Sequence, residues 1–303
     1  EFIQPLFPDM VSVCVISALN AMHWDEIKEN PQMIVDSFMF LDILNEEYIL
    51  LTKDIPFMDR ARKAAIDKRD IGLGLIGFAE LLQKKGLAYG DMYSRSLNKE
   101  IFSTIREWGE FYTKKIGEKL GSPRICEEAG LVRRNASLMM VAPNKSTSFI
   151  SGMTSGGIEP FMSNMFMKSL AKIQYVFKNP HLERVLKSRD KNTSQVWESI
   201  QDNNGSVQHL DFLSLSEKET FRTFAEISPK DLIDLASDRQ EFIDMGQSLN
   251  LVFRKNYNLQ DIIAIHQYAW EKDIKTLYYA YSSAHAALEV EGKGWDDCAS
   301  CMD

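Results

Sequence analysis

Two of the four cysteines in this 303-residue chain, Cys298 and Cys301, lie close together near its C-terminal end. Thiols at this spacing can form a reversible disulfide, so a mobile dithiol here could carry electrons by thiol–disulfide exchange. The alternative is a frayed chain end that contains cysteine by chance, because order is poorest at the termini. The spacing alone does not distinguish these two interpretations.

A hydroxyl-rich turn follows a strand-like segment in the middle of the chain. The run SLMMV leads through Pro143 into a polar turn, and a helix that begins there would present free N–H groups and a positive dipole end to a phosphate. An ordinary Ser/Thr helix N-cap would explain the same sequence about equally well. The polar residues concerned are Asn144, Lys145, Ser146, Thr147 and Ser148.

Two adjacent tyrosines, Tyr278 and Tyr279, form another candidate site. On a helix, neighbouring side chains point about 100° apart, so the two rings could not both join one packing stripe. One ring in the core and one at its rim would be the ordinary arrangement. The functional alternative is a pair of stacked phenols that pass an electron and a proton between them.

The segment GLGLIG satisfies the pattern G-x-G-x-x-G through Gly72, Gly74 and Gly77. A dinucleotide site of this kind needs an apolar strand immediately before the glycines and an acidic residue about 20 positions later. Asp91 falls near that distance, but the preceding residues AAIDKRD are charged. We therefore expect the glycines to permit tight helix–strand packing, and we keep a nicotinamide-dependent oxidoreductase as an alternative.

The remaining cysteines and the five histidines give no sign of a metal site. Cys14 lies in an apolar run and Cys126 has no partner nearby, so both are expected to be buried structural residues. The histidines show no close metal-ligand spacing, and Cys298 with Cys301 would supply only half of a zinc site. We expect this chain to bind no metal.

Composition and charge restrict the function classes. The chain is 45% hydrophobic, which is enough for one large core or two ordinary ones, and its net charge of -8 argues against a nucleic-acid-coating surface. No apolar run reaches the roughly 18 to 20 residues of a membrane span, and no signal peptide is visible. We expect a cytoplasmic protein with small-molecule or protein partners, in which a cysteine pair is catalytic or metal-binding rather than a structural disulfide.

Strand and helix signals alternate in the first part of the chain, which favours an α/β architecture with a largely buried sheet. Beyond about Leu182 the sequence predicts amphipathic helices over 229–253 and 258–281, and no periodicity follows Tyr281. The earlier predicted elements are a buried strand at Val11–Ser17 that includes Cys14, helices over 30–54 and 94–121, and short apolar segments at 70–78 and 136–143. The first helix carries apolar residues near helical spacing at Met33, Ile34, Phe38, Phe40, Leu41 and Leu44.

The ordered set of motifs closely resembles the catalytic large subunit of class I ribonucleotide reductase, along nearly the whole chain. The motifs are VSVCVISALN, DIGLGLIGFAELL, APNKSTSFISG, GGIEPF, DRQEFIDMGQSLNL and KTLYY, followed by Cys-x-x-Cys. In that family a thiyl radical inside a ten-stranded α/β barrel removes the 3′ hydrogen of a ribonucleoside diphosphate, and a redox cysteine pair reduces the ribose. The resemblance implies the second half of the barrel over 1–180, a helical C-terminal region over 181–281 and a flexible redox tail over 282–303.

The resemblance also implies roles for individual residues. Cys14 corresponds to one member of the redox pair, and Glu1 to the carboxylate that takes the 3′ hydroxyl proton, unless Glu1 is a chain-terminal residue left by processing or cloning. Tyr278 and Tyr279 match the dyad that relays the radical. The substrate diphosphate loop corresponds to Pro143, Asn144, Lys145, Ser146, Thr147 and Ser148, although the family more often has an acidic residue at the position of Lys145.

Partners follow from the same resemblance. A metal-containing small subunit would supply the radical, thioredoxin or glutaredoxin would reduce Cys298 and Cys301, and this chain would bind no cofactor itself. The allosteric domain, the radical cysteine and the first redox cysteine would lie upstream of residue 1. We therefore expect a split or processed large subunit that assembles with an N-terminal polypeptide, which would cover exposed strand edges. The alternative is a non-catalytic relic or interaction fragment.

Overall fold

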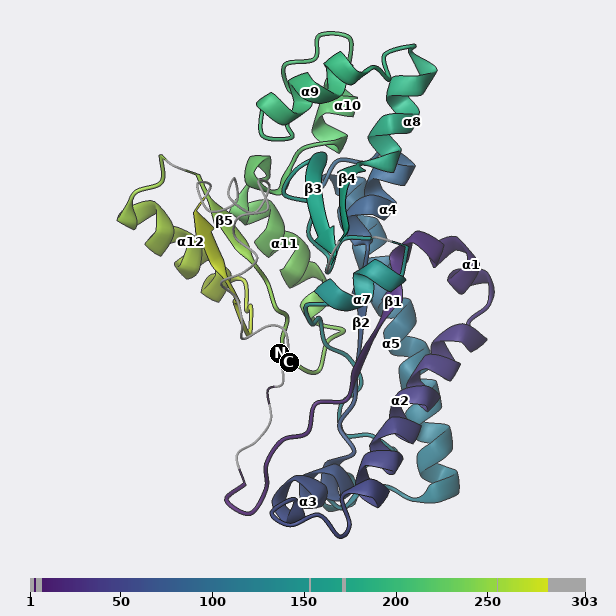
Figure 1. Cartoon of the computed structure of the whole chain (residues 1–303). Helices are drawn as coiled ribbons and strands as arrows, with labels where there is room; N and C mark the ends of the chain where they lie inside the picture. The colour runs from purple at the N-terminus through teal and green to yellow at the C-terminus, as the bar shows by residue number, and fades with distance from the viewer. Residues whose placement is uncertain (1–2, 4–6, 153, 171–172, 255, 283–303) are drawn as a thin grey trace. The chain divides into compact units, whose positions relative to one another are not determined.

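The computed structural model describes residues 3 to 282, apart from residues 4–6, 153, 171, 172 and 255 (Figure 1). The chain forms two compact units, and each is made of three separate stretches of sequence. The first unit contains Glu1–Ile76, Ser96–Gly157 and Ala236–Ser248, and the second contains Gly77–Arg95, Ile158–Leu235 and Leu249–Asp303. A division of the sequence near residue 180 stays a prediction.

A parallel sheet organises the first unit. Strand β1 (Ile16–Asn20) pairs in parallel with β2 (Gly72–Ile76), and isolated parallel bridges join Leu73 to Met139 and Val141 to Gln247. Four segments thus lie side by side in sequence order, and parallel neighbours need long crossovers. The first crossover holds η1 (Ala21–His23), α1 (Trp24–Glu29), α2 (Gln32–Leu51) and α3 (Asp59–Lys68). The chain between β2 and Met139 holds α4 (Phe78–Lys85), which belongs to the second unit, then α5 (Met92–Leu120), which begins in the second unit and continues in the first, and α6 (Arg124–Glu128). The predicted α/β architecture is confirmed, and the described residues form no closed barrel.

The predicted strand at Val11–Ser17 is only partly correct. The strand begins at Ile16, and Cys14 is exposed rather than buried within it. Among the described segments β1 pairs on one side only, and the residues just before it differ in burial, with Val15 8% exposed beside the exposed Cys14. Cys126, in contrast, is buried at 3% exposure, and its structural role stays a prediction.

The glycines of GLGLIG serve packing within the sheet. A Cβ atom at Gly72 would collide with the Sδ of Met140, and one at Gly74 would lie 2.5 Å from the carbonyl oxygen of Met140. Both glycines lie inside strand β2, whereas a dinucleotide fingerprint needs them in the turn after a strand. The expected packing role is therefore supported, although the neighbour is an extended segment instead of a helix.

One face of helix α2 is buried within the first unit. Ile34, Phe38 and Leu41 are fully buried, and the Phe38 ring stacks on Tyr112 of α5 with a centroid distance of 6.2 Å. The remaining apolar residues of the predicted stripe are exposed, with Met33 at 39%, Phe40 at 55% and Leu44 at 39%. The spacing thus identified the helix but not the width of its buried face.

Two segments predicted as continuous helix contain strands instead. Helix α11 (Pro229–Gln240) ends before strand β5 (Leu251–Phe253), and α12 (Leu259–Glu271) ends before β6 (Ala280–Ser282), which pairs with β5 in parallel. Between α11 and β5, Asp244 accepts hydrogen bonds from the backbone of Leu138 at 2.8 Å and of Met139 at 3.1 Å. The pairing of β5 with β6 and the bonds to Asp244 join residues far apart in the sequence, and they override the local helical pattern.

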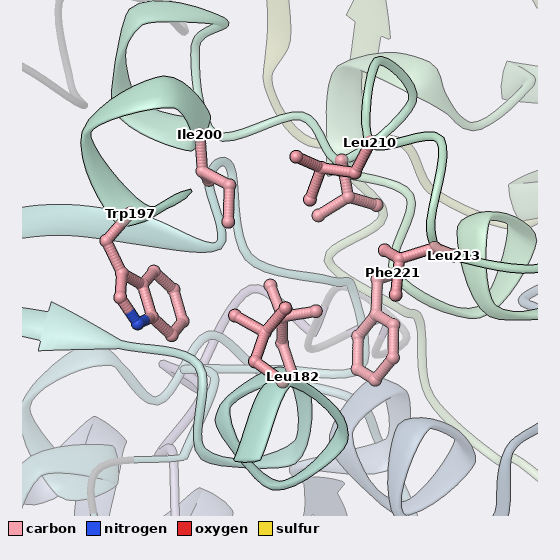
Figure 2. Packing of buried hydrophobic residues seen from close by; sticks show 8 residues of the cluster. Leu182, Trp197, Ile200, Leu210, Leu213 and Phe221 are labelled. Carbon is pink, nitrogen blue, oxygen red and sulfur yellow. The ribbon is translucent and has the colours of Figure 1, made fainter. Parts of the chain in front are cut away.

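The second unit adds a hairpin and a group of short helices. Strands β3 (Met165–Leu170) and β4 (Ile173–Lys178) pair in antiparallel fashion. The helices that follow are α8 (Pro180–Ser188), α9 (Ser194–Asp202), α10 (Leu215–Thr220) and η2 (Phe224–Glu226). Figure 2 shows side chains from α8, α9 and the following turns converging on one apolar cluster. The cluster consists of Leu182, Leu186, Trp197, Ile200, Val207, Leu210, Leu213 and Phe221.

The buried imidazole of His181 makes this group of helices sensitive to acid. Burial lowers its pKa to about 4, and the nearby charges of Arg184 and Lys84 act in the same direction. In the unfolded chain a histidine titrates near 6.5, so between about pH 6.5 and 4 the unfolded state binds more protons than the folded one. The free energy of unfolding should therefore decrease as the pH falls through this window, by at most about 3 kcal/mol.

Urea unfolding at a series of pH values measures this effect, and His181→Gln, which carries no charge at any pH, should remove the His181 part of the slope. Parallel pH profiles for the two proteins would show that the buried imidazole does not control acid sensitivity.

Candidate active site

The hydroxyl-rich segment forms a strand-to-helix turn in the first unit. The extended residues up to Ala142 are followed by α7 (Lys145–Ile150). The alternative of an ordinary Ser/Thr N-cap is not observed: the N-cap residue is Asn144, whose side chain makes no capping hydrogen bond and donates from Nδ2 to the Ala142 carbonyl at 2.8 Å. The Asn144 N–H donates to the carbonyl of Gly156 at 2.6 Å. The Asn144 side chain and the Gly156 carbonyl therefore help to hold this turn, and Asn144 does not cap the first N–H groups of α7.

The hydroxyls of this turn differ in exposure. Thr147 is exposed, whereas Ser148 is 3% exposed and its N–H donates to the Asn144 carbonyl at 2.9 Å. Pro143, which precedes the turn, is also exposed. A hydroxyl on the surface of the turn is in a position to donate to a bound anion, and the buried one is in a position to support the backbone.

Asn20, at the end of β1, connects the sheet to this turn. Its Nδ2 donates to the carbonyl of Ser151 at 2.9 Å, and its Oδ1 accepts from the Met22 N–H at 3.0 Å. One side chain therefore caps η1 and holds the residue that follows α7. Asn20 was not among the site residues predicted from the sequence; an asparagine at the boundary between a strand and a helix was the available signal.

Cys14 lies at the opposite end of the paired segments. It precedes the first paired residue of β1, Ile16, whereas Asn144 follows the last bridged residue of its segment, Val141. The segments run parallel, so the structure places the thiol and the hydroxyl-rich turn at different ends of one sheet. The Cys14 side chain is exposed, as a reactive thiol must be, because only an accessible sulfur can exchange with a second thiol.

The tyrosine pair lies in the second unit, in extended backbone just before β6. The rings are 4.1 Å apart between centroids at an interplanar angle of 51°, and the Tyr278 hydroxyl donates to the Tyr279 hydroxyl at 3.3 Å. Tyr278 is 43% exposed and Tyr279 is half-buried, so neither ring is a core residue. The divergence expected on a helix is wrong here, because the backbone is not helical and the phenols face each other.

Backbone hydrogen bonds fix the pair to the segment before β5. The Tyr278 N–H donates to the Leu249 carbonyl at 2.9 Å, and the Leu251 N–H donates to the Tyr279 carbonyl at 2.8 Å. The Tyr279 N–H also donates to Asn250 Oδ1 at 3.2 Å. Glu159, which the sequence analysis did not assign to a site, accepts from the Asn250 N–H at 3.2 Å. The rings are thus held by main-chain contacts on both sides.

Three predicted site residues, Glu1, Cys298 and Cys301, lie outside the described residues. In the described part of the chain, no group of three or more His, Cys, Asp and Glu side chains is arranged to hold a metal ion. No helix among the described residues has both the length and the apolar character needed to cross a bilayer.

Comparison with known proteins gives a consistent family assignment. The family model described as "Ribonucleotide reductase, barrel domain" matches residues 1–123 and 124–280. The ribonucleoside-diphosphate reductase large subunit of Invertebrate iridescent virus 6 is 36% identical over 286 residues, which cover 93% of this chain and 29% of that protein. The same subunit of Invertebrate iridescent virus 3 is 33% identical over 312 residues, which cover 99% of this chain and 49% of that protein.

Solved structures agree with the sequence comparisons. The class Id ribonucleotide reductase alpha subunit of Actinobacillus ureae superposes with a TM-score of 0.85 and 37% sequence identity, over 93% of this chain and 52% of that one. The chain thus spans about half or less of the length of the relatives that it matches.

Proposed function

The chain belongs to the ribonucleotide reductase barrel-domain family, and on this premise we propose that it is the C-terminal part of a class I large subunit. In this role it takes part in the radical reduction of ribonucleoside diphosphates to deoxyribonucleoside diphosphates. The observation that carries the proposal is the tyrosine pair, whose tilted rings are in contact at a centroid distance of 4.1 Å, within a chain that matches the family model up to residue 280. The four parallel segments of the first unit form part of the family's ten-stranded barrel.

The residue roles follow from chemistry and position. Tyr278 and Tyr279 relay the radical from a metal-containing small subunit, because two phenols in contact can exchange an electron and a proton. Cys14 forms the active-site disulfide with a cysteine from the N-terminal part of the large subunit. The tail dithiol, Cys298 and Cys301, then reduces that disulfide by exchange and is itself reduced by thioredoxin or glutaredoxin. Glu1 accepts the proton of the 3′ hydroxyl.

The turn before α7 binds the substrate diphosphate. The N–H groups at the start of α7, which the Asn144 side chain does not cap, and the exposed Thr147 hydroxyl are donors, and anions are stabilised at helix N-termini. The residues of this site are Pro143, Asn144, Lys145, Ser146, Thr147 and Ser148. Residues 181–281 supply the relay and residues 282–303 the redox tail.

Asn20 positions the diphosphate turn, and its replacement tests this part of the site. Asn20→Ala in the complete reductase should raise the KM for CDP about two- to tenfold, which corresponds to the loss of one net hydrogen bond, and should change kcat less. Asn20→Asp is the matched control for the helix cap, because it keeps the acceptor for Met22 and loses the donor to Ser151. Equal KM values for Asn20→Asp and the unmodified protein would contradict this role.

Reconstitution tests the proposed function. The chain is assayed alone and together with the N-terminal part of the large subunit, each with small subunit, dithiol reductant and nucleotide effector, for conversion of CDP to dCDP. Activity only in the combination supports the proposal. If no combination forms dCDP although each component is folded, the result would favour a non-catalytic relic. Turnover that is unchanged when Cys14 or Tyr278 is replaced would favour the same alternative.

A further inference from the structure

A third tyrosine continues the row of phenol rings beyond the pair. Tyr281 lies in β6, two residues after Tyr279, so the two side chains are on the same face of the extended backbone. Their ring centroids are 5.6 Å apart with an interplanar angle of 42°. This separation is within the 4.5 to 7 Å range of aromatic contacts in proteins.

The position of Tyr281 is fixed by the same strand pairing that fixes the pair. Tyr281 is opposite Val252 in the parallel register of β5 and β6, and the Leu251 N–H binds the Tyr279 carbonyl. Tyr281 is half-buried, like Tyr279. The three rings therefore keep their spacing without any rearrangement of the backbone, as a path for rapid electron transfer requires.

We propose that Tyr281 is a third redox-active tyrosine, which exchanges the radical with Tyr279. The proposal rests on the proposed function, because the oxidant is the phenoxyl radical that the relay forms on Tyr279. In the exchange, the Tyr279 radical gains one electron and one proton and becomes a phenol, while Tyr281 loses one electron and its hydroxyl proton and becomes the radical. Atoms and charge balance, and no further reactant is needed.

Two features favour exchange over a packing role alone. Donor and acceptor are the same kind of side chain and both are half-buried, so the exchange converts one tyrosyl radical into another. The ring separation of 5.6 Å is also only slightly larger than the 4.1 Å within the pair that carries the relay. Tyr281 thus offers a side branch on which the radical can reside while it remains in equilibrium with Tyr279.

A trapping experiment tests the proposal. Each of three tyrosines is replaced singly by 3-aminotyrosine, a phenol that is easier to oxidise, in the complete large subunit. The complex with small subunit, CDP and effector is frozen during turnover, and the aminotyrosyl radical is measured by electron paramagnetic resonance. The positions are 279 as the relay reference, 281 as the test and 268 as the control. The amino groups of Lys230 and Lys272 lie 5.1 and 5.3 Å from the centroid of the Tyr268 ring.

The expected result is a radical at position 281 with a yield comparable to that at position 279, and background signal at position 268. A radical at 279 with background at 281 would overturn the third-tyrosine proposal and leave the proposed function intact. Background at 279 as well would overturn both. If the amino group at 281 prevents assembly with the small subunit, 3,4-dihydroxyphenylalanine at this position provides the same measurement with a different substituent.

Discussion

Replacement of Tyr279 by phenylalanine is expected to reduce CDP turnover of the complete reductase to the background rate. Phenylalanine keeps the ring that lies 4.1 Å from Tyr278, so packing is preserved, but it lacks the hydroxyl that accepts the 3.3 Å hydrogen bond. Without a phenolic O–H the residue cannot form a radical by loss of an electron and a proton. The rate of dCDP formation measures the effect.

Two controls make this prediction specific. Tyr257→Phe removes a hydroxyl from a half-buried tyrosine that packs on Phe253 at 5.8 Å, and it should leave turnover unchanged. The melting temperature of Tyr279→Phe should also match that of the unmodified protein. Turnover within about twofold of the unmodified enzyme would show that Tyr279 does not carry the radical, because a step lost from an obligatory relay is far more costly than that.

Removal of the Asp42 carboxylate should cause a large loss of stability. Asp42 and Arg69 are 6% and 5% exposed, and Asp42 Oδ1 accepts from Arg69 Nη2 at 2.9 Å and from Asn135 Nδ2 at 3.0 Å. The second oxygen accepts from Arg134 Nε at 3.3 Å. In Asp42→Ala the buried guanidinium of Arg69 loses its main partner, so the free energy of unfolding should fall by about 3–5 kcal/mol. Urea unfolding measures this change.

Glu46 provides the matched control for Asp42. It binds Arg69 Nη1 at 2.7 Å, but its side chain is 46% exposed, so solvent screens the pair. Glu46→Ala should cost at most about 1 kcal/mol. Similar losses for Asp42→Ala and Glu46→Ala would show that burial does not set the strength of this network.

Much of the candidate site was accessible from sequence because its residues lie close together along the chain. Tyr278 and Tyr279 are adjacent, and the hydroxyl-rich turn is one short segment after an apolar run, so neither depended on knowledge of distant contacts. The exposure of Cys14 was not accessible, because an apolar run reads as buried whether or not a second strand covers it. The role of Asn20 was not accessible for a different reason: its contact to Ser151 spans 131 positions, and no local pattern relates residues that far apart.

By itself the sequence determined the alternation of strand and helix, the packing role of the glycines in β2 and the family to which the ordered motifs point. These properties depend on local periodicity, on residue size and on motifs that are contiguous in the chain. Only the tertiary structure decided that the chain after α11 and after α12 becomes extended, that the two phenols face each other and that Tyr281 continues their row. Backbone pairing between β5 and β6 imposes these features, and it joins residues 29 positions apart, such as Leu251 and Ala280, which no local pattern relates.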